Sequence, residues 1–531
     1  MPPAANRGLL PPTLRPALKR DRLPALLTGL FLLLAGFVMF HHELWRDEVQ
    51  GWLLARDSAS LPALVAAMRY EGHPALWQLL LLPLTRAFAS PVAMQVLHLL
   101  LAATTVYLFV RWSPFSRGQK ALFCFGYFPF YEYGVISRNY GLCLLLLTVF
   151  GCLYPHRHRR FLSLAACLAL LCHAHALGLL LALALLAALG VERLVRPGAS
   201  GPEPGTPRPA FYGGCALVLV AALLAFWQLN PPADASSGGW SGDRANLGTF
   251  QATQALAGGY LPVPTPAQDF WNRPLVFDDR FGLPQRSLRV AVVLYAGFVA
   301  LALRRHLPAL LFFGTANAAL LAFFHLRFAG AARHHGFFFL VLMVAIWMHR
   351  SAQRESGGDG RTAPPAWWDR LLNPSLTLLL ALHGAGTLVS ATQEIRHPFS
   401  RAPAVATYLR RHGHQTSLLV GYRDYMASSV LAGTTQQRIY YPQARRWGSY
   451  IRWNRQRLNR VEDAELIAAA RALPREPGQG LVLILNRALD ANSPLPGGLT
   501  LLAAYHGSVS GENFYLYQIE EETGPAGAAR D

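Results

Sequence analysis

Long apolar segments recur along the first three quarters of the chain, and they constrain its fold more than any other feature. The first covers residues 23–40, and later ones have similar lengths. Segments of roughly 17 to 22 apolar residues can cross ~30 Å of hydrocarbon as helices. Of the 531 residues, 53% are hydrophobic and only 15% are charged. The sequence therefore predicts a polytopic α-helical membrane protein.

Short loops rich in arginine separate these segments and predict how the chain crosses the membrane. Such loops stay on the cytoplasmic side. If all of them lie there, the segment 73–88, which contains Pro74, Pro83 and Arg86, lies at or dips into the outer face without crossing. About eleven spans remain, with the N-terminus in the cytoplasm and the C-terminus outside. They are 23–40, 91–110, 120–134, 138–154, 161–174, 176–193, 210–229, 288–304, 307–325, 334–349 and 373–391.

Residues 392–531 have a different pattern and are expected to form a second domain. Patterned segments of helical character alternate there with apolar runs of strand length, such as 417–420, 481–485 and 514–519. We expect residues 1–391 to form the multi-span domain, with a first outer loop at 41–90. Residues 392–531 should form a soluble exoplasmic α/β domain that covers its own core. This part has no cysteine, so no disulfide framework is expected in it.

The formal net charge of +19 is better explained by topology than by nucleic acid. Nearly all of the positive charge is arginine, because Lys19 and Lys120 are the only lysines. The basic residues lie in short loops and in the C-terminal part, without forming one stripe. The basic stretch before residue 23 is not followed by a small-residue cleavage site, so we interpret it as part of an uncleaved anchor. We expect a multi-pass protein of the inner (plasma) membrane.

An acidic pair, Asp47 and Glu48, stands directly after the first apolar segment, within the pentad Trp45-Arg46-Asp47-Glu48-Val49. Carboxylates at a membrane face are costly and usually serve chemistry. Asp47 also stands where a helix begins, so it could be a helix cap. The alternative is a catalytic base held where a lipid-linked substrate would present its reacting carbon.

The order of several motifs resembles a known enzyme family. The acidic pair is followed by a His-Pro-x-Leu-Trp helix start at His73 and then by an Arg-x-Tyr at Arg138 and Tyr140. Together these look like the GT-C glycosyltransferases, particularly the protein O-mannosyltransferase and lipid A aminoarabinose transferase group, over roughly residues 20–340. One departure is Ala75, where the family usually has a second proline.

The resemblance implies transfer of a sugar from a polyprenyl-phosphate donor to a lipid, glycan or protein acceptor at the outer face, with inversion at the anomeric carbon. Asp47 would then be the base, and Glu48 would assist in positioning. The sequence indicates no cofactor. A divalent cation is compatible with it, but no residue pattern points to one. The terminal domain matches no known acceptor-binding module, so the acceptor stays open.

An inverting reaction also needs a phosphate site some way from Asp47, and several residues are candidates for it. Arg333 and His334 follow a small-residue turn, where an arginine could grip phosphate or could border a span at the headgroups. Arg138 could bind phosphate or pair with Glu132. We expect these four residues, with His73 and Tyr140, to form the substrate and phosphate site. His73 could instead set the helix start, and His173 and His175 lack partners at metal spacing.

Two further features and two other functional classes complete the expectations. The loop 230–287 contains Trp240, Asp243 and Trp271, which could stack on a sugar or anchor at the interface. A transporter or flippase for a lipid-linked saccharide would also use arginines near the membrane, but repeated halves are not evident. A non-catalytic assembly partner would not need Asp47.

Overall fold

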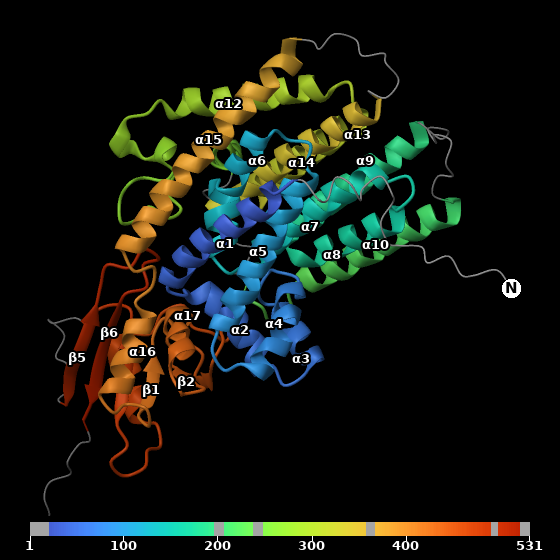
Figure 1. Ribbon diagram of the computed structural model, residues 1–531. Coiled ribbons are helices and arrows are strands. Elements are labelled where there is room, and N and C mark those ends of the chain that lie inside the picture. The colour runs from blue at the N-terminus through green and yellow to red at the C-terminus, as the bar shows by residue number, and fades with distance from the viewer. Residues whose placement is uncertain (1–20, 196–206, 237–247, 357–366, 490–497, 521–531) are drawn as a thin grey trace, which may run out of the picture.

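The computed structural model describes residues 21–195, 207–236, 248–356, 367–489 and 498–520. The basic N-terminal stretch, residues 196–206 and 357–366 of the loops expected on the cytoplasmic side, and Trp240 and Asp243 lie outside the described residues. Figure 1 shows a bundle of long helices joined to a smaller domain that contains a β-sheet.

Nine long apolar helices in the described residues are suitable for crossing a membrane, which confirms the predicted fold class. Their spanning parts have mean hydropathies between 1.2 and 2.3. The helices are α1 (Leu23–His41), α5 (Val92–Trp112), α7 (Asn139–Leu153), α9 (Ala176–Val195), α10 (Arg208–Leu229), α12 (Gln285–Leu303), α13 (Leu307–Leu326), α14 (Ala332–Ser356) and α15 (Trp367–Arg396).

Two of the expected spans take another form. The segment 120–134 is not one helix but a short α-helix, α6 (Arg117–Cys124), followed by a π-helix, η3 (Tyr127–Val135). The break falls at Phe125 and Gly126, where a Cβ on Gly126 would lie 3.0 Å from the Leu122 carbonyl oxygen. The segment 161–174 forms α8 (Phe161–Ala174), whose 14 residues extend about 21 Å.

Two polar clusters mark the opposite ends of the bundle. One lies where α7, α9 and α14 begin, and it contains Tyr140, His175 and His334. The other lies near the ends of the same helices, where the Arg157 guanidinium contacts carboxylates of Glu192 and Glu355 at 3.0 and 2.8 Å. A single 3₁₀ turn, η4 (Tyr154–His156), follows α7 there. Because α8 starts just after Arg157 and ends next to His175, it runs from one end to the other despite its length.

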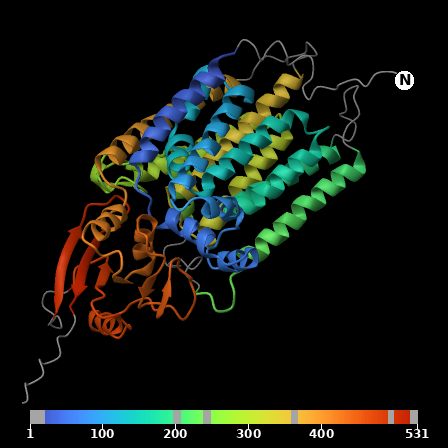
Figure 2. The ribbon, with the colours of Figure 1, turned by 60° about the horizontal axis from the view of Figure 1, so that its bottom comes forward.

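The segment 41–90, which the sequence predicts as the first outer loop, folds into three short helices at the first of these ends. They are α2 (Arg46–Asp57), α3 (Leu61–Met68) and α4 (Leu76–Ala87). The α4 helix has 12 residues with Pro83 inside it and packs against α2. It is not among the spanning helices, as expected for the segment 73–88. Figure 2 shows the three helices between the bundle and the smaller domain.

A long connection between α10 and α12 covers the same end. It contains α11 (Thr249–Tyr260) and two 3₁₀ turns, η7 (Leu275–Phe277) and η8 (Asp279–Phe281). The α11 helix packs against α12, α13 and α14. It carries Gly258 and Gly259 where α14 approaches, and a Cβ on Gly258 would lie 2.9 Å from the His335 ring. The connection therefore lies tightly against the start of α14.

The terminal domain contains a six-stranded mixed sheet in the order β3-β2-β1-β4-β6-β5. The β1 strand is parallel to β2 and β4, and the remaining pairs are antiparallel. The strands are β1 (Leu418–Gly421), β2 (Ile439–Tyr441), β3 (Arg446–Gly448), β4 (Leu481–Leu485), β5 (Leu499–Tyr505) and β6 (Phe514–Ile519). The helices are α16 (Ala402–Arg411), α17 (Asp424–Ala427), η10 (Ser428–Gly433) and α18 (Asp463–Arg471).

The terminal domain shares one hydrophobic cluster with the α2 helix. One hydrophobic cluster combines Val49, Trp52 and Leu53 of α2 with side chains such as Val405 and Leu431 of the terminal domain. The side-chain amide of Gln50 also exchanges two hydrogen bonds with the Ile451 backbone, at 3.0 and 2.9 Å. The periodicity of a segment shows that one face is buried, but not which partner buries it.

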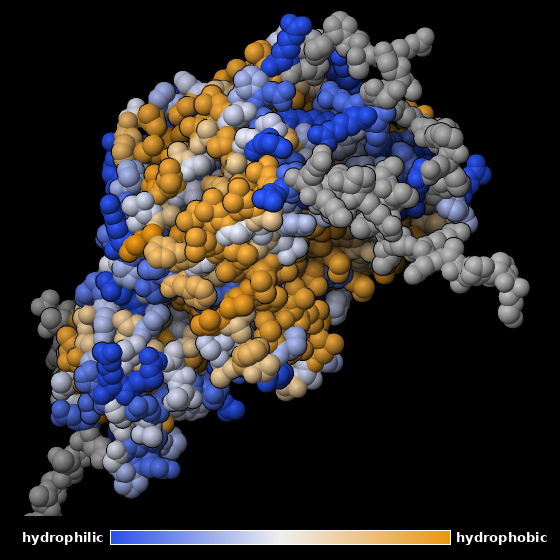
Figure 3. All heavy atoms as spheres, in the orientation of Figure 1, coloured by the Kyte–Doolittle hydropathy of each residue, from blue (hydrophilic) through white to orange (hydrophobic). Residues whose placement is uncertain are grey.

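The surface of the bundle is apolar where lipid would surround it. Large hydrophobic side chains point outward from α1, α10 and α12, and Leu33, Leu223 and Leu294 are each 69% exposed. Figure 3 shows such side chains over the flank of the bundle, with hydrophilic residues on the terminal domain and at the far end. An apolar surface of this extent indicates a membrane-embedded region.

Candidate active site

The start of α2 is fixed by Glu48 and leaves the Asp47 carboxylate available. A Glu48 carboxylate oxygen accepts a hydrogen bond from the Trp45 backbone N–H at 3.2 Å, which satisfies a donor that the helix itself leaves free. The next free donor, the Arg46 backbone N–H, is satisfied by Glu512 of the terminal domain at 2.8 Å. The cap that the sequence allowed for Asp47 is therefore supplied by Glu48.

Glu48 is fully buried in a polar network below Asp47. One of its oxygens lies 2.8 Å from His42 Nε2, and the other accepts the Ser137 backbone N–H at 2.6 Å. The other His42 nitrogen lies 3.0 Å from Glu394. Burial lowers the pKa of His42, but the two carboxylates outweigh it and hold this pKa well above its usual value. Glu48 thus anchors the backbone immediately before Arg138 and does not face open space.

The Asp47 carboxylate lies among three arginines. It is 2.6 Å from an Arg138 nitrogen, 3.8 Å from an Arg333 nitrogen and 3.7 Å from an Arg46 nitrogen. Its side chain is 31% exposed, whereas that of Arg138 is 10% exposed. Burial raises the pKa of Asp47, but Arg138 and Arg333 outweigh this and hold the pKa below its ordinary range. Asp47 is therefore ionised at neutral pH and surrounded by more positive charge than it can neutralise.

Two indole rings support the arginines. The guanidinium of Arg333 lies 5.4 Å from the Trp45 ring centroid and 5.3 Å from that of Trp271. These two indoles pack edge to face at 4.7 Å. Trp271 donates its indole N–H to Glu132 at 3.2 Å. Trp271, which comes from the connection between α10 and α12, therefore forms one wall of the arginine cluster.

Glu132 lies below the cluster and does not pair directly with Arg138. It accepts hydrogen bonds from Tyr127 at 2.9 Å and from Trp271. Arg138 pairs instead with Asp47, which replaces the Glu132–Arg138 ion pair considered from the sequence. The other Glu132 carboxylate oxygen is buried without a hydrogen-bond partner.

Three histidine rings gather behind Arg138. His334 accepts the Ala331 N–H on Nδ1, so the neutral ring carries its proton on Nε2 and donates it to the Tyr140 hydroxyl at 3.0 Å. His175 lies 4.9 Å from the Tyr140 ring and 5.0 Å from the His73 ring. His175 Nε2 and His73 Nδ1 are buried without hydrogen-bond partners. Burial, followed by the nearby Arg138, lowers the pKa of His73 to about 3, so this ring is neutral.

Two cavities meet at Asp47. The first has a volume of about 140 Å³ and enters the bundle between α7, α9, α13 and α14, where Tyr140, His175 and Phe323 line it. The second has a volume of about 530 Å³ and lies under the terminal domain, where Tyr425 and Trp453 line it. Five residues line both: Asp47, Glu71, His73, Arg138 and Arg333. A molecule in each cavity would therefore meet its neighbour beside the Asp47 carboxylate.

Glu71 is a member of this shared wall that the sequence interpretation missed. It accepts a hydrogen bond from the Gln50 side chain at 2.9 Å. Burial raises its pKa to about 7. The sequence feature that could have identified Glu71 is its position two residues before His73, in the same 41–90 segment. Nothing in the local pattern separated it from an ordinary exposed glutamate.

The structure brings together Asp47, His73, Arg138, Tyr140, Arg333 and His334 of the predicted residues and leaves Glu48 and Glu132 underneath them. In the described part of the chain, no group of three or more His, Cys, Asp or Glu side chains has an arrangement suited to a metal ion. The local charge comes from arginines, which bind phosphate through paired N–H donors.

Comparisons with protein-family models, with curated proteins and with solved structures gave no match. The resemblance to GT-C glycosyltransferases therefore stays a prediction.

Proposed function

We propose that this protein is an integral-membrane glycosyltransferase that takes a sugar from a polyprenyl-phosphate donor and transfers it to an acceptor at the outer face of the membrane. The observation that carries the proposal is the position of Asp47. Its carboxylate lies where the bundle cavity and the terminal-domain cavity meet, and two arginines contact it there. On this proposal the protein is a multi-pass protein of the plasma membrane, with the Asp47 end and the terminal domain outside.

The donor enters through the bundle cavity. Apolar side chains such as Leu177, Phe323 and Phe328 line it beside Arg138 and Arg333, which suits an isoprenoid phosphate. A lipid phosphate at the end of the bundle can be reached from the bilayer, and the two guanidinium groups supply the donors that its oxygens need. His334, Tyr140 and His175 form the neutral polar wall behind it.

The reaction is a single displacement at the anomeric carbon. Asp47 accepts the proton of the acceptor hydroxyl, and the hydroxyl oxygen forms a bond to the anomeric carbon. The bond from that carbon to the phosphate oxygen breaks, and its electron pair stays on the polyprenyl phosphate. Arg138 and Arg333 stabilise the charge of this leaving group. Attack from the side opposite the phosphate inverts the anomeric configuration.

The ion pair between Asp47 and Arg138 gives the donor a second role. Without donor, Arg138 satisfies the carboxylate and lowers its basicity. A phosphate that binds Arg138 and Arg333 competes for the same N–H donors and weakens their hold on Asp47. The base therefore becomes stronger when the donor is in place, which limits wasteful reaction with water before that point.

The acceptor occupies the cavity under the terminal domain. Tyr425 and Trp453 offer aromatic faces, and the Arg46 guanidinium lies 5.2 Å from the Tyr425 ring centroid. Aromatic faces beside charged groups suit the stacking and hydrogen bonding of a sugar or another hydroxyl-bearing head group. A lipid, glycan or protein hydroxyl would reach Asp47 from this side, so the terminal domain forms part of the acceptor site.

The packing of α14 favours the glycosyltransferase proposal over the transporter alternative. Its side chains from Phe337 to Met348 are all at most 5% exposed, and they lie between the Asp47 end and the far end of the bundle. A transporter binds its substrate near the middle of the membrane between repeated halves. The cavities at Asp47 lie instead where the helices begin.

The proposal is tested with purified protein in lipid vesicles and a panel of polyprenyl-phosphate sugars. Mass spectrometry should find one donor converted to free polyprenyl phosphate when an acceptor-bearing membrane extract is added. Vesicles without protein control for spontaneous breakdown. If no donor in the panel is consumed but labelled donor crosses the bilayer, the transporter alternative replaces the proposal.

A further inference from the structure

A separate polar cavity lies at the end of the bundle away from Asp47. Its volume is about 610 Å³, and it is bordered by the start of α6, the end of α14 and the start of α15. Arg333 at the active site and Arg350 at this cavity both lie on α14, about 25 Å apart at 1.5 Å per residue. The two sites therefore lie at opposite ends of one membrane-crossing helix.

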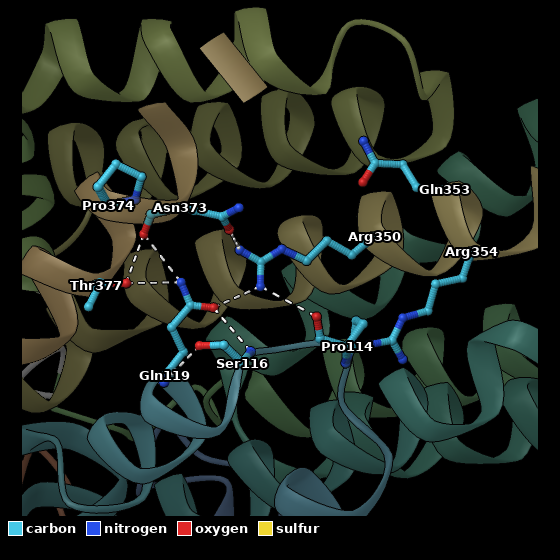
Figure 4. A pocket seen from close by; sticks show the side chains of 9 residues that line it. All are labelled: Pro114, Ser116, Gln119, Arg350, Gln353, Arg354, Asn373, Pro374 and Thr377. Carbon is cyan, nitrogen blue, oxygen red and sulfur yellow. Dashed lines mark hydrogen bonds between the residues drawn. The ribbon is translucent and has the colours of Figure 1, made fainter. Parts of the chain in front are cut away.

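The Arg350 guanidinium in this cavity is held by neutral acceptors alone. It donates to the Gln119 side-chain oxygen at 2.9 Å, to the Asn373 side-chain oxygen at 2.6 Å and to the Pro114 carbonyl at 3.4 Å. Figure 4 shows it extending between these three groups, which come from the stretch 114–119 and from α15. The Phe115 ring covers it at 4.6 Å. No carboxylate whose side chain the structure describes pairs with this half-buried charge.

Further positive charge surrounds the same cavity. Arg354 lies one turn later on α14 and lines the cavity with Gln353. Lys120 lies close enough to Arg354, Asp21 and Arg111 to interact with their charges. Among the described residues that line the cavity, none is acidic, and Ser116, Asn373 and Thr377 add neutral hydrogen-bonding groups. The lining of the cavity is therefore positively charged and has the donors to bind an anion.

We infer that this cavity binds the phosphate group of an anionic membrane phospholipid, with Arg350 at its base and Arg354 at its rim. Paired guanidinium groups bind phosphate oxygens through charge-assisted hydrogen bonds. Basic pockets between transmembrane helices on the cytoplasmic side are suited to lipid head groups. The inference goes beyond the proposed transfer reaction, because it uses none of the residues around Asp47.

A lipid is a better occupant than a soluble anion because the cavity adjoins an apolar outer surface. On the turns of α15 that carry Asn373 and Thr377, Leu371 is 50% exposed and Leu378 is 64% exposed. Acyl chains can lie along this face while the head group reaches Arg350. Since Arg350 already connects α6, α14 and α15, a bound phosphate would tie these three helices together more firmly.

The test compares lipids that differ only in head-group charge. Purified full-length protein is titrated with phosphatidylglycerol and with phosphatidylcholine of the same chains, and native mass spectrometry counts the molecules retained. We expect one phosphatidylglycerol to be retained about tenfold more tightly than phosphatidylcholine. Arg354→Gln should remove most of this preference, because it removes a positive charge from the rim of the cavity. The variant should fold normally, because this side chain makes no hydrogen bond within the described structure. Arg350→Gln should remove it too, where the variant folds.

Arg160→Gln is the matched control, since it removes an exposed arginine from the same end of the bundle outside the cavity. Retention that is equal for both lipids, or unchanged in Arg354→Gln, overturns the inference. A third arm adds millimolar inorganic phosphate as competitor. Displacement of the lipid by phosphate alone at comparable affinity would assign the cavity to the free ion and reject the lipid as its occupant.

Discussion

Arg138 and Asp47 are 91 residues apart in the sequence, yet their side chains are joined by a 2.6 Å hydrogen bond at the junction of two cavities. Arg138 immediately precedes α7, and the backbone before it is fixed by buried Glu48, the direct neighbour of Asp47. The two carboxylates of the acidic pair therefore have different roles. One carboxylate orients the turn that carries the arginine, and the other meets the arginine at the site.

Asp47→Asn should abolish transfer while folding stays nearly intact and donor binding is at least as tight as in the wild type, because the phosphate no longer competes with the carboxylate for Arg138 and Arg333. The substitution removes the proton acceptor with little change in shape, and losing a general base commonly lowers the rate ~100- to 10,000-fold. The measurement is donor consumption by mass spectrometry. Asp57→Asn, at the exposed far end of the same helix, is the control and should leave the rate unchanged. Near wild-type turnover by Asp47→Asn would refute the assignment.

Arg138→Ala and Arg333→Ala should each weaken binding of the polyprenyl-phosphate sugar by about 1.5–3 kcal/mol, because each removes charge-assisted hydrogen bonds to phosphate. Binding is measured in vesicles with labelled donor. Arg327→Ala removes an exposed arginine six positions before Arg333, in the connection between α13 and α14, and should have no such effect. Unchanged affinity in both site variants, with normal folding, would place the phosphate elsewhere.

Donor affinity should fall as the pH rises through about 7, because Glu71 then ionises. Burial raises the pKa of Glu71 to about 7, and the charged form lies beside the arginines that should bind phosphate. Asp47 titrates well below this range, and a phosphodiester donor does not titrate in it. Glu71→Gln mimics the protonated form, so it should bind donor equally well on both sides of pH 7 and keep its turnover. A loss of turnover as large as that of Asp47→Asn would instead make Glu71 the base.

The contact between the outer loop and the terminal domain should make stability depend on pH. Burial raises the pKa of Glu512, which accepts hydrogen bonds from the Arg46 N–H and the Ser400 hydroxyl, to about 7. A carboxyl whose pKa is higher in the folded than in the unfolded state contributes stability at low pH, which is lost as the pH rises through the folded value. The apparent melting temperature should therefore fall between about pH 5 and about pH 8.

Glu512→Gln should reduce this fall, because glutamine stays neutral throughout. Part of the fall should remain, since Glu71 has a raised pKa of the same sign. Glu465→Gln, an exposed position on α18, should behave as wild type. Melting curves of Glu512→Gln that match wild type at every pH would show that the Glu512 carboxyl has an ordinary pKa.

The predicted sidedness can be read from single cysteines. In a cysteine-free background, Ser90→Cys and Thr416→Cys should react with an impermeant thiol reagent added outside, and Arg117→Cys and Arg160→Cys should not. All four positions are exposed, so burial would not prevent labelling. Labelling of Arg117→Cys from outside would show that the 73–88 segment crosses the membrane, or that the whole chain is inverted.

Apolar length by itself located the long spans, and it failed where helix geometry is broken. Residues 120–134 are mostly apolar apart from Lys120 and Glu132, so the pattern predicts one span. In the structure, Gly126 separates α6 from a π-helix in which the Tyr127 hydroxyl donates to Glu132 and the Tyr131 hydroxyl donates to Glu394. Hydropathy measures the cost of exposing side chains to water. It contains no information about where the hydrogen-bond pattern of a regular helix is interrupted.

The sequence alone determined that this chain is a multi-span helical protein with a terminal α/β domain, because segment length, charge and periodicity reflect the physics of hydrocarbon and water. It also singled out Asp47, His73, Arg138 and Arg333 as unusual for their positions. Only the tertiary structure decided that Glu71 joins them, that Glu132 does not pair with Arg138, and that the terminal domain shares its core with α2. Each of these depends on contacts between distant segments, and local patterns record that a residue is buried or charged without recording its partner.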